Sequence, residues 1–515
     1  MTEAQQASAS PSRVRGRVLR TVVWLLSVGG MLAVALPADG VEPDMTPSPP
    51  PASPAAQATV VIDRQAPRAA IPKEFLGLSF ELASAGQIAE YGSRGDFVGL
   101  LRSLGPGVLR LGGASADTRV AWVDPATPRP AWASSVLDVA DLRELRVLAQ
   151  RSGWRVLLTI GLAHYEPRAA AREARAAKST LGHWLAGIEI GNEPDSYGNH
   201  GLRPLPWTPS EYETQVSSYR RAIAAVAPGI PVAGPGVSGS RAFQKWGPAE
   251  VRRQHPMLLT GHHYPLRCDS VPAPTIEDLL SEKVREKEGE SLLRFLAVSQ
   301  ASGTPFRMDE TNTVSCGGRA GISNTFASAL WAVSYITRTM AAGAAGINLQ
   351  GNPANCSGYS PVCAVSPTTL AAGQLNAQPE WYGLLFTKAL IGDRPIPSRV
   401  ISQTTQGNLS VNALRTPSGG LQFVIVEDDP VGGPATTVSL HAGRGFKTAS
   451  SLELLGPSLG ARSGVTLGGL AMRSDGSFGE PAEGPPVPVR EGAVSVTVPA
   501  GSATLVTVTR AEAHG

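Results

Sequence analysis

Short apolar runs alternate with longer amphipathic stretches between residues 73 and 392. Eight of the runs have the length and the β-branched or aromatic content of buried strands. They are Phe75–Glu81, Val108–Gly113, Arg155–Leu162, Leu185–Gly191, Pro231–Val237, Leu258–Tyr264, Pro305–Glu310 and Gly346–Gln350. Helical patterns lie between them, among others at Asp138–Ser152, Thr208–Ala227, Thr275–Ser302 and Ser323–Ala342. Eight strands, each followed by a crossover, predict a (β/α)8 TIM barrel over residues 73–392.

A doubly wound parallel sheet would show the same alternation of strands and helices. Such a sheet often carries a Gly-rich loop that binds phosphate, and the sequence has no such fingerprint. The count of eight units and the missing fingerprint both favour the barrel.

The pattern changes after residue 392. Five segments alternate apolar and polar residues between Gly and Pro turns, and no helix-length pattern interrupts them. They are Asn408–Leu414, Gly420–Val426, Thr436–Leu440, Ala493–Val498 and Ser502–Val508. This alternation predicts a C-terminal antiparallel β-sandwich over residues 393–515. Residues 59–72 are expected to add an N-terminal strand to it.

The N-terminus has the pattern of a secretory signal. Basic residues precede the apolar run Thr21–Leu36, and small residues follow it, which predicts a signal peptide over residues 1–38. The run is shorter than the roughly 20 residues that span a membrane. Residues 39–58 are rich in Pro, Ala and Ser and predict an extended linker. We therefore expect a protein secreted to the extracellular space or periplasm; an uncleaved N-terminal anchor is the alternative.

The composition is that of a globular protein with a substantial core, since 42% of the residues are hydrophobic and 17% are charged. The formal net charge is only +3, and no basic patch is interleaved with aromatic residues. The sequence thus gives no reason to expect nucleic acid as a partner. It also predicts no membrane contact, unless the N-terminal signal stays uncleaved.

Four cysteines, an even number, occur in a chain that is expected to leave the reducing cytosol. Cys268 and Cys316 follow the sixth and seventh predicted strands, which are neighbours in a barrel, so their loops share one rim. We expect these two cysteines to pair, and Cys356 to pair with Cys363 within the loop after the eighth strand. Four free, buried thiols are the alternative.

Two glutamates stand where barrel enzymes carry their chemistry, at the C-terminal ends of strands. Glu193 follows the fourth strand in Asn192-Glu-Pro-Asp195, and Glu310 ends the seventh. Three βα units separate the two residues, which places both at the same mouth of the barrel. Glycoside hydrolysis needs such a pair, one carboxyl group to protonate the departing oxygen and one carboxylate at the anomeric carbon. Asn192 is expected to donate a hydrogen bond to the 2-hydroxyl of the sugar.

The sequence resembles glycoside hydrolase family 79, the β-glucuronidase and heparanase family, over roughly residues 60 to 515. The matching segments are Phe75–Glu81, Leu109–Gly113 with Asp117, Glu189–Asp195, His262–Pro265, Asp309–Gly318 and Gly358–Pro361. The resemblance implies a retaining mechanism with Glu193 as acid/base and Glu310 as nucleophile. It also implies that Tyr264 bonds the nucleophile and that Glu81 holds sugar hydroxyls.

The resemblance further implies an acidic sugar as substrate. Family members use a tyrosine in the loop after the eighth strand to bind the glucuronate carboxylate, and Gly358-Tyr359 occupies that place. The expected function is an exo-acting β-glucuronidase that removes glucuronic acid from extracellular oligosaccharides or polysaccharides. Two alternatives remain open: a retaining β-glycosidase of the same clan with a neutral sugar, and a non-catalytic carbohydrate-binding barrel.

Neither a metal nor another cofactor is expected. His262 and His263 are neighbours on one strand and therefore point to opposite faces, and no third ligand accompanies them at a metal-binding spacing. His262 can line the site, whereas His263 belongs to the core. Strand alternation likewise predicts that Asp309 points away from the mouth if Glu310 points into it. Arg110 either pairs with the nucleophile or closes a buried charge network.

Overall fold

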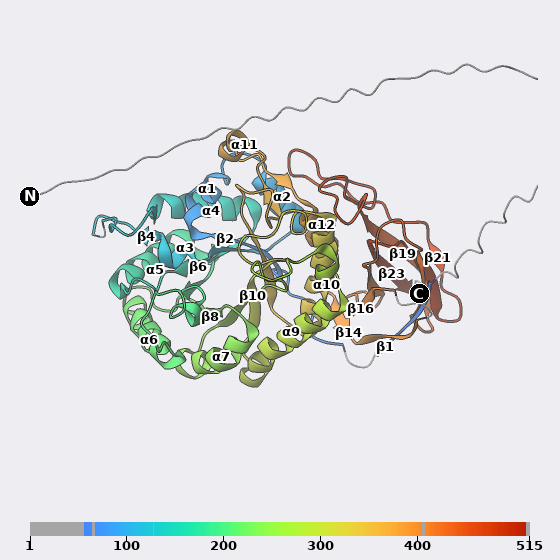
Figure 1. The fold of residues 1–515 in the computed structure, drawn as a ribbon, viewed down its shortest axis with the longest axis horizontal. Helices are drawn as coiled ribbons and strands as arrows, with labels where there is room; N and C mark the ends of the chain where they lie inside the picture. The colour runs from blue at the N-terminus through green and yellow to red at the C-terminus, as the bar shows by residue number, and fades with distance from the viewer. Residues whose placement is uncertain (1–55, 64–66, 127, 404–406, 511–515) are drawn as a thin grey trace, which may run out of the picture. The chain divides into compact units, whose positions relative to one another are not determined.

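The computed structural model describes residues 56–63, 67–126, 128–403 and 407–510. The predicted signal peptide and all but the last three residues of the predicted linker lie outside these ranges. All described residues belong to one compact unit that holds a barrel and two further sheets (Figure 1). None of the helices in this part of the chain is long and apolar enough to cross a bilayer.

Eight parallel strands close a barrel in the order β10-β11-β2-β3-β6-β7-β8-β9, which confirms the predicted TIM barrel. Their bounds are β2 Leu76–Glu81, β3 Val108–Gly112, β6 Arg155–Ile160, β7 Leu185–Ile190, β8 Val232–Val237, β9 Leu258–His263, β10 Phe306–Thr311 and β11 Gly346–Gly351. Each observed strand coincides with one predicted apolar run. Figure 1 shows the strands enclosed by a ring of helices.

The longer helices cover the outside of the barrel. The α-helices are α1 Ala85–Glu90, α2 Phe97–Leu104, α3 Ser115–Thr118, α4 Val139–Ser152, α5 Pro167–Leu181, α6 Pro209–Val226, α7 Ser240–Gln254, α8 Ile276–Leu279, α9 Glu282–Ser302, α10 Phe326–Ala342, α11 Pro367–Ala372 and α12 Pro379–Lys388. The stretch predicted as one helix, Thr275–Ser302, forms two. Ser281 separates them because its hydroxyl accepts a hydrogen bond from the Val284 N–H and caps α9.

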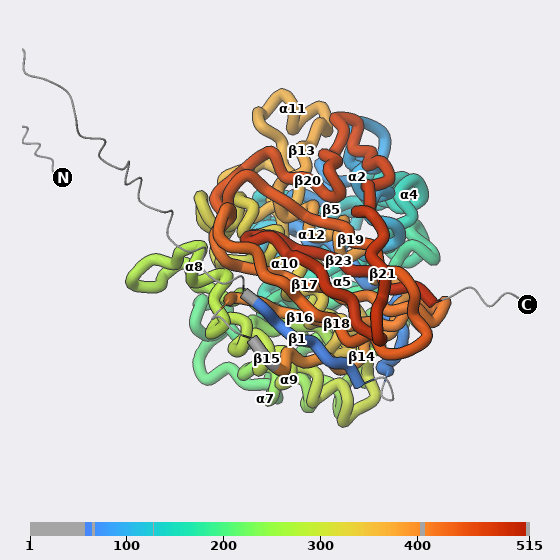
Figure 2. The backbone as a smooth tube through the Cα atoms, turned by 90° about the vertical axis from the view of Figure 1, so that its right-hand side faces the viewer, coloured from blue at the N-terminus to red at the C-terminus, as the bar shows by residue number. Residues whose placement is uncertain are grey.

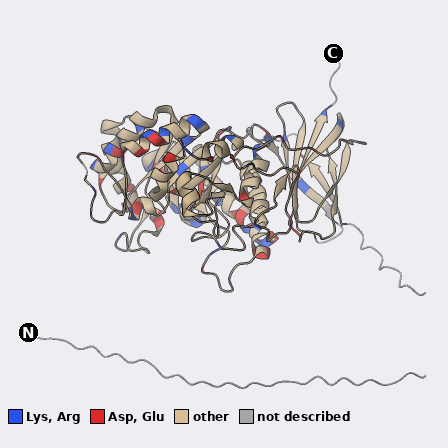
Figure 3. Ribbon diagram, turned by 90° about the horizontal axis from the view of Figure 1, so that it is seen from above, with Lys and Arg blue, Asp and Glu red and all other residues tan. Residues whose placement is uncertain are grey.

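Strand alternation in the barrel separates a hydrophobic outer face from a polar interior. In β3, Leu109 and Leu111 belong to the core that the barrel shares with its helices, whereas Arg110 between them contacts Glu189 and Glu310 across the barrel. Positions of acidic and basic residues are interspersed along the surrounding helices (Figure 3). The barrel interior thus holds buried charged side chains, among them Arg110, Glu189 and Glu310.

Two sheets follow the barrel and pack face to face, which confirms the predicted sandwich. One has the order β15-β1-β18-β22, and the other has the order β14-β16-β17-β23-β19-β20 with β21 beside β19. The strands are β1 Ala56–Ile62, β14 Arg394–Ile396, β15 Ser398–Gln403, β16 Leu409–Arg415, β17 Leu421–Glu427, β18 Thr436–His441, β19 Phe446–Leu455, β20 Thr466–Leu467, β21 Val487–Pro488, β22 Ala493–Val498 and β23 Ser502–Arg510. Side chains of both sheets, among them Val60, Val438 and Phe423, share one core.

The N-terminal strand β1 lies inside the sandwich, where its blue trace runs among orange and red strands (Figure 2). It pairs antiparallel with β15 and parallel with β18, so the sandwich contains one parallel pair that the alternation did not predict. The strand begins at Ala56, three residues before the predicted start of order, because Ala56, Gln57 and Ala58 pair with β18. The last residues of the predicted linker thus belong to a strand.

Candidate active site

Glu193 lies in the turn that follows β7, at the C-terminal mouth of the barrel. Its backbone is in the left-handed region, with φ 48° and ψ 51°, a conformation that costs a non-glycine residue about 1–2 kcal/mol. Two hydrogen bonds hold the turn: the Glu193 N–H donates to the Gly236 carbonyl at 2.8 Å, and the Asn192 N–H donates to Asp117 Oδ2 at 2.8 Å. These hydrogen bonds stabilise an unfavourable backbone conformation, and this conformation sets the direction of the Glu193 side chain.

Glu310 belongs to β10, where the register against β9 shifts between Met308 and Glu310. Because of this irregularity, Asp309 and Glu310 both point into the barrel, and both carboxylates contact Arg110. The sequence-based prediction that Asp309 points away from the mouth is therefore wrong. Strict alternation fails at this position because one extra residue is accommodated between the ladder pairs.

The two predicted glutamates converge on one another. Oxygen atoms of Glu193 and Glu310 and a ring nitrogen of His262 all lie within 4.8 Å of each other. His262 Nδ1 is 2.9 Å from Glu193 Oε1 and 3.9 Å from Glu310 Oε2. Glu310 is 7% exposed, and the Glu193 side chain is 26% exposed. One carboxyl group is thus enclosed and the other faces the mouth.

Arg110 joins the acidic groups below the mouth. Its Nη1 donates to Glu310 Oε2 at 2.7 Å, and its Nη2 donates to Glu189 Oε2 at 2.9 Å and to Asn192 Oδ1 at 2.9 Å. Its Nε lies 2.9 Å from Asp309 Oδ2. The sequence left two roles open for Arg110, and the structure shows both. The residue pairs with Glu310, and it also closes a buried charge network with Glu189 and Asp309.

The surroundings of Glu310 favour its ionised form. Burial alone would raise the pKa of Glu310, but the positive charges of His262 and Arg110 and a hydrogen bond from Tyr264 outweigh it and lower that pKa. Tyr264 Oη donates to Glu310 Oε1 at 2.9 Å, the contact that the family resemblance implied. Burial, followed by the charge of Glu310, raises the pKa of Tyr264 well above its usual range, so the phenol keeps its proton and donates. Both oxygens of Glu310 are held.

His262 is buried in this cluster. Burial works against a charged imidazole, yet the charge of Glu310 and the hydrogen bond to Glu193 raise the pKa of His262 to about 9. Its neighbour His263 points to the other face of the strand, where Nδ1 is 3.2 Å from Ser291 Oγ and the ring lies near Tyr335. The predicted division between a site-lining and a core histidine matches this arrangement.

A second pair of carboxyl groups, Glu189 and Asp309, lies deeper in the barrel. Burial and the charge of Glu189 raise the pKa of Asp309 to about 8. The pKa of Glu189 is lowered, because Arg110 and His262 outweigh the effect of burial. Asp309 therefore holds a proton at neutral pH, while Glu189 is ionised. The Glu189 carboxylate accepts hydrogen bonds from Arg110, Thr159 and Thr260 below the mouth.

Glu81, at the end of β2, and Tyr359, in the loop after β11, lie near Glu310. Glu81 Oε2 accepts a hydrogen bond from the Ser115 N–H at 2.9 Å, and burial raises the pKa of Glu81. The Tyr359 hydroxyl is 3.3 Å from that of Tyr264, and the two rings are stacked at 5.7 Å. The substrate-binding residues that the resemblance indicated thus surround the two glutamates.

The loop that carries Tyr359 is fixed at several points. Gly358 packs against the Gly317 carbonyl, and the Tyr359 N–H donates to that carbonyl at 3.1 Å. Both predicted disulfides are present: Cys268–Cys316 joins the loops after β9 and β10, and Cys356–Cys363 closes the loop after β11. A Cβ at position 358 would meet the Gly317 oxygen at 2.0 Å, so this contact requires glycine.

Glu193, His262 and Glu310 are also the one group among the described residues that could hold a metal ion. Sequence spacing gave no third ligand because the three residues come from three different strands. Arg110 already supplies a positive charge at 2.7 Å from Glu310, which would repel a cation bound there. The donor set thus fits an ion-pair network better than a metal site.

A cavity of about 260 Å³ opens beside Glu193. Its walls include Asn192, Asp117, Tyr197, His200 and Leu202. The last three lie in the loop after β7, and sequence reasoning did not single them out. Their position within ten residues of a strand-end glutamate is the signal that could have found them.

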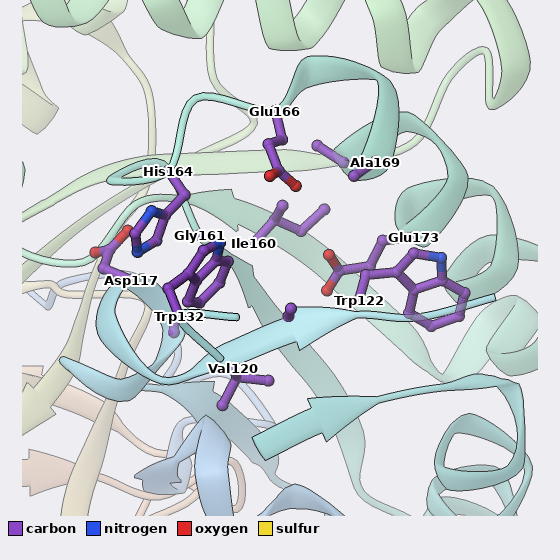
Figure 4. Close-up of a pocket in the computed structure, with 13 residues that line it drawn as sticks. Asp117, Val120, Trp122, Trp132, Ile160, Gly161, His164, Glu166, Ala169 and Glu173 are labelled. Carbon is purple, nitrogen blue, oxygen red and sulfur yellow. The ribbon is translucent and has the colours of Figure 1, made fainter. Parts of the chain in front are cut away.

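A smaller cavity of about 30 Å³ lies on the other side of Asp117 (Figure 4). Trp132 stacks on His164 at its entrance, with ring centroids 3.7 Å apart, and the carboxyl group of Glu173 faces it. This volume is enough for a single water molecule and too small for a sugar.

No protein-family model matches the chain, and no curated protein matches it. Solved structures do. A 4-O-α-L-rhamnosyl-β-D-glucuronidase from Fusarium oxysporum superposes with a TM-score of 0.70 at 19% identity over 88% of this chain and 100% of that one. A family 51 arabinofuranosidase from Xanthomonas axonopodis has a TM-score of 0.62 at 13% identity, and a family 30 endoxylanase from Clostridium papyrosolvens has a TM-score of 0.52 at 13% identity. Both cover the same shares of the two chains as the first structure, 88% and 100%. Likeness at these identities shows the fold alone.

Proposed function

We propose that the chain is a retaining β-glycoside hydrolase with Glu310 as nucleophile and Glu193 as acid/base. The observation that carries this proposal is the approach of the two carboxyl groups within 4.8 Å at the mouth of the barrel. Retaining glycosidases hold their carboxyl groups about 5–5.5 Å apart, whereas inverting enzymes need about 6.5–9.5 Å to admit a water molecule. The solved structures that share the fold include three glycosidases, which agrees with this reaction class.

The reaction proceeds by double displacement. Glu310 attacks the anomeric carbon while the glycosidic bond breaks, and Glu193 gives its proton to the departing oxygen. A glycosyl ester of Glu310 results. Glu193 then takes a proton from water, whose oxygen attacks the anomeric carbon and releases the Glu310 carboxylate. Asn192 Oδ1 is held by Arg110, which leaves the amide NH2 group to donate to the 2-hydroxyl of the sugar.

We propose glucuronic acid as the sugar, released by exo action from extracellular glycans. Three observations support this substrate: the motifs shared with family 79, the stacked phenols of Tyr264 and Tyr359 beside the nucleophile, and the β-D-glucuronidase among the structures with this fold. Phenolic hydroxyls can donate to a carboxylate. The N-terminal signal pattern and the two disulfides support secretion.

Two variants test the reaction. Glu310→Gln removes the nucleophilic oxygen and should lower kcat at least 10⁴-fold, as loss of a covalent catalyst typically does. Glu193→Ala should slow substrates with poor leaving groups far more than aryl glycosides with activated ones, because only the former need protonation. Near-normal turnover by the Glu310→Gln protein would rule out Glu310 as the nucleophile.

A panel of chromogenic glycosides tests the sugar. We expect turnover of the aryl β-glucuronide and at least a hundredfold lower kcat/KM for the matching β-glucoside. Exo action predicts free glucuronic acid as the first product from an oligosaccharide. If the glucoside is hydrolysed strongly and the glucuronide not at all, the substrate is a neutral sugar and the proposal of glucuronic acid is wrong.

A further inference from the structure

A further cavity, of about 400 Å³, lies where the barrel meets the sandwich, and it shares no lining residue with the cavity beside Glu193. The barrel contributes Leu100 of α2, the short strand β13 (Asn376–Ala377) and the start of α12. The sandwich contributes segment 462–474, which follows β19 and contains β20. The volume lies within the range of small-molecule sites in proteins, about 300–1,000 Å³.

The walls of this cavity are fixed by contacts between the barrel and the sandwich. The Met472 N–H donates to the Tyr382 hydroxyl at 2.9 Å, and β20 pairs with β19 through Leu454 and Leu467. The backbone of Asp475 lies so close to α2 that a Cβ added at Gly99 would meet its carbonyl oxygen at 2.6 Å. The cavity is therefore already formed before anything binds.

Positive charge distinguishes this cavity. Arg462 and Arg473 are the charged residues among its described lining, which contains no aspartate or glutamate. Within the described part of the chain, the Arg462 side chain has no ion pair or hydrogen bond, and the Arg473 side chain has a long hydrogen bond, 3.4 Å to Ser477 Oγ. The carboxylate of Asp475 accepts from the N–H and hydroxyl of Ser477, at 2.9 and 2.6 Å, and interacts electrostatically with Arg473. The Arg462 guanidinium is thus available to an anion, and Arg473 adds a second positive charge to the lining.

The neutral part of the lining suits a saccharide. Asn376 and Gln378 supply amides, and Thr466 supplies a hydroxyl group. Amides and hydroxyls bond sugar hydroxyls, and guanidinium groups bind carboxylate or sulfate through paired hydrogen bonds. This combination is the chemistry that recognises an acidic sugar.

The cavity is connected to the loop of Tyr359. Strand β13 pairs with β12 (Val362–Cys363), with Cys363 opposite Asn376, and Cys363 is four residues from Tyr359. Four extended residues and one strand spacing span at most about 20 Å. Asn376 in the cavity wall thus lies within this distance of Tyr359, a span that an oligosaccharide of several sugar units can cover.

We propose that this cavity binds an acidic saccharide unit through Arg462 and Arg473 and anchors a glycan whose other end enters the barrel mouth. The link to the mouth rests on the proposed function, whereas the binding does not. Calorimetry with the Glu310→Gln protein and a glucuronate-containing disaccharide, which is too short to occupy the mouth and the cavity at once, should show two binding sites. The Arg462→Ala/Arg473→Ala version should lose one of them, with affinity there at least tenfold weaker.

Four comparisons make the result decisive. Arg444→Ala/Arg490→Ala, which removes two exposed arginines outside the cavity, should keep both sites. A neutral disaccharide should not bind the cavity, and excess inorganic sulfate should displace the acidic disaccharide from it. With otherwise wild-type protein, the cavity variant should raise KM for a glucuronate-containing octasaccharide several-fold and leave kcat/KM for a small aryl glucuronide unchanged.

Retention of both sites in the cavity variant, or equal binding of the neutral disaccharide in the cavity, would overturn the proposal. Absence of the second disaccharide site in the Glu310→Gln protein would do the same. If no glycoside is hydrolysed but the arginine-dependent site binds the acidic disaccharide, the proposed function fails and the binding site stands.

Discussion

Four carboxyl groups, Glu189, Glu193, Asp309 and Glu310, surround one arginine and one histidine inside the barrel. Asp309 keeps its proton and Glu310 loses its own, although the two are neighbours in sequence. The difference comes from position, because His262 and Arg110 act more strongly on Glu310, whereas burial and the charge of Glu189 dominate at Asp309. The charge state of each residue is thus a property of the whole cluster.

His262 should control the acidic limb of the pH–rate profile. Exchange to Gln keeps a donor near Glu193 and removes the positive charge near Glu310, so the pKa of Glu310 should rise. Protonated Glu310 cannot attack, and the acidic limb of kcat/KM should therefore move to higher pH by about one unit or more. Steady-state kinetics across pH 3–8 measure this shift.

The exposed His183→Gln provides the matched control and should leave the profile in place. An acidic limb at the wild-type position in His262→Gln would show that the imidazole does not set the ionisation of Glu310.

Sequence patterns indicated the residues of the mouth correctly, because strand ends in a barrel face one side. Glu193, Glu310 and Tyr264 meet as expected. The inward turn of Asp309 was not predictable, since a register shift depends on how β10 pairs with β9 and leaves no mark in local composition. The left-handed backbone of Glu193 was equally hidden, because tertiary hydrogen bonds enforce it.

At the scale of elements, helix α5 carries a buried glutamate, Glu173, whose effect on the free energy of unfolding depends on pH. Burial alone raises the pKa of Glu173 from 4.5 to about 8. Between these two values the unfolded chain releases the proton and the folded chain keeps it. The contribution of Glu173 to stability is therefore full below pH 4.5, falls as pH rises towards 8 and is lost above that.

Glu173→Gln should remove this dependence. Relative to wild type, the variant should gain stability between pH 5 and pH 8, by a few kcal/mol at about 1.4 kcal/mol for each pKa unit. Denaturant unfolding at both pH values measures the gain, and Glu286→Gln, at an exposed position, controls for the loss of one acidic residue. A difference that is the same at both pH values would contradict the expectation.

The sequence predicted the helices and strands better than it predicted the breaks between them. All eight barrel strands were predicted, because their apolar runs are flanked by turn residues and separated by helical patterns. The break between α8 and α9 was missed because Leu279 and Leu280 continue the helical pattern across it. The capping serine at 281 is the local signal that marks the new start.

For the whole molecule, the sandwich covers an apolar side of the barrel. Buried residues of β17, β19 and β23, including Val424, Leu454 and Leu505, share one core with α10 and α12. Removal of the sandwich would expose this surface. The two parts are therefore expected to fold as one cooperative unit.

A chain that ends at Gly392 should accordingly be insoluble or aggregate on expression, with at least tenfold less soluble protein than the full chain. Solubility after lysis and size-exclusion chromatography measure the outcome. A soluble monomeric barrel with the thermal midpoint of the full protein would show that the shared core contributes little.

The position of β1 bears on how the protein is made. Ile62 pairs with Ser398 in the sandwich, so the earliest strand to leave the ribosome finds its antiparallel neighbour only after the entire barrel has been synthesised. Until then its backbone donors and acceptors are open to pairing with other chains. The time that β1 spends without its partner strands is therefore set by the synthesis of the barrel and by the folding of the sandwich. Mutations that slow the pairing of β1 with β15 should for this reason lower the yield of folded protein more than they lower its stability.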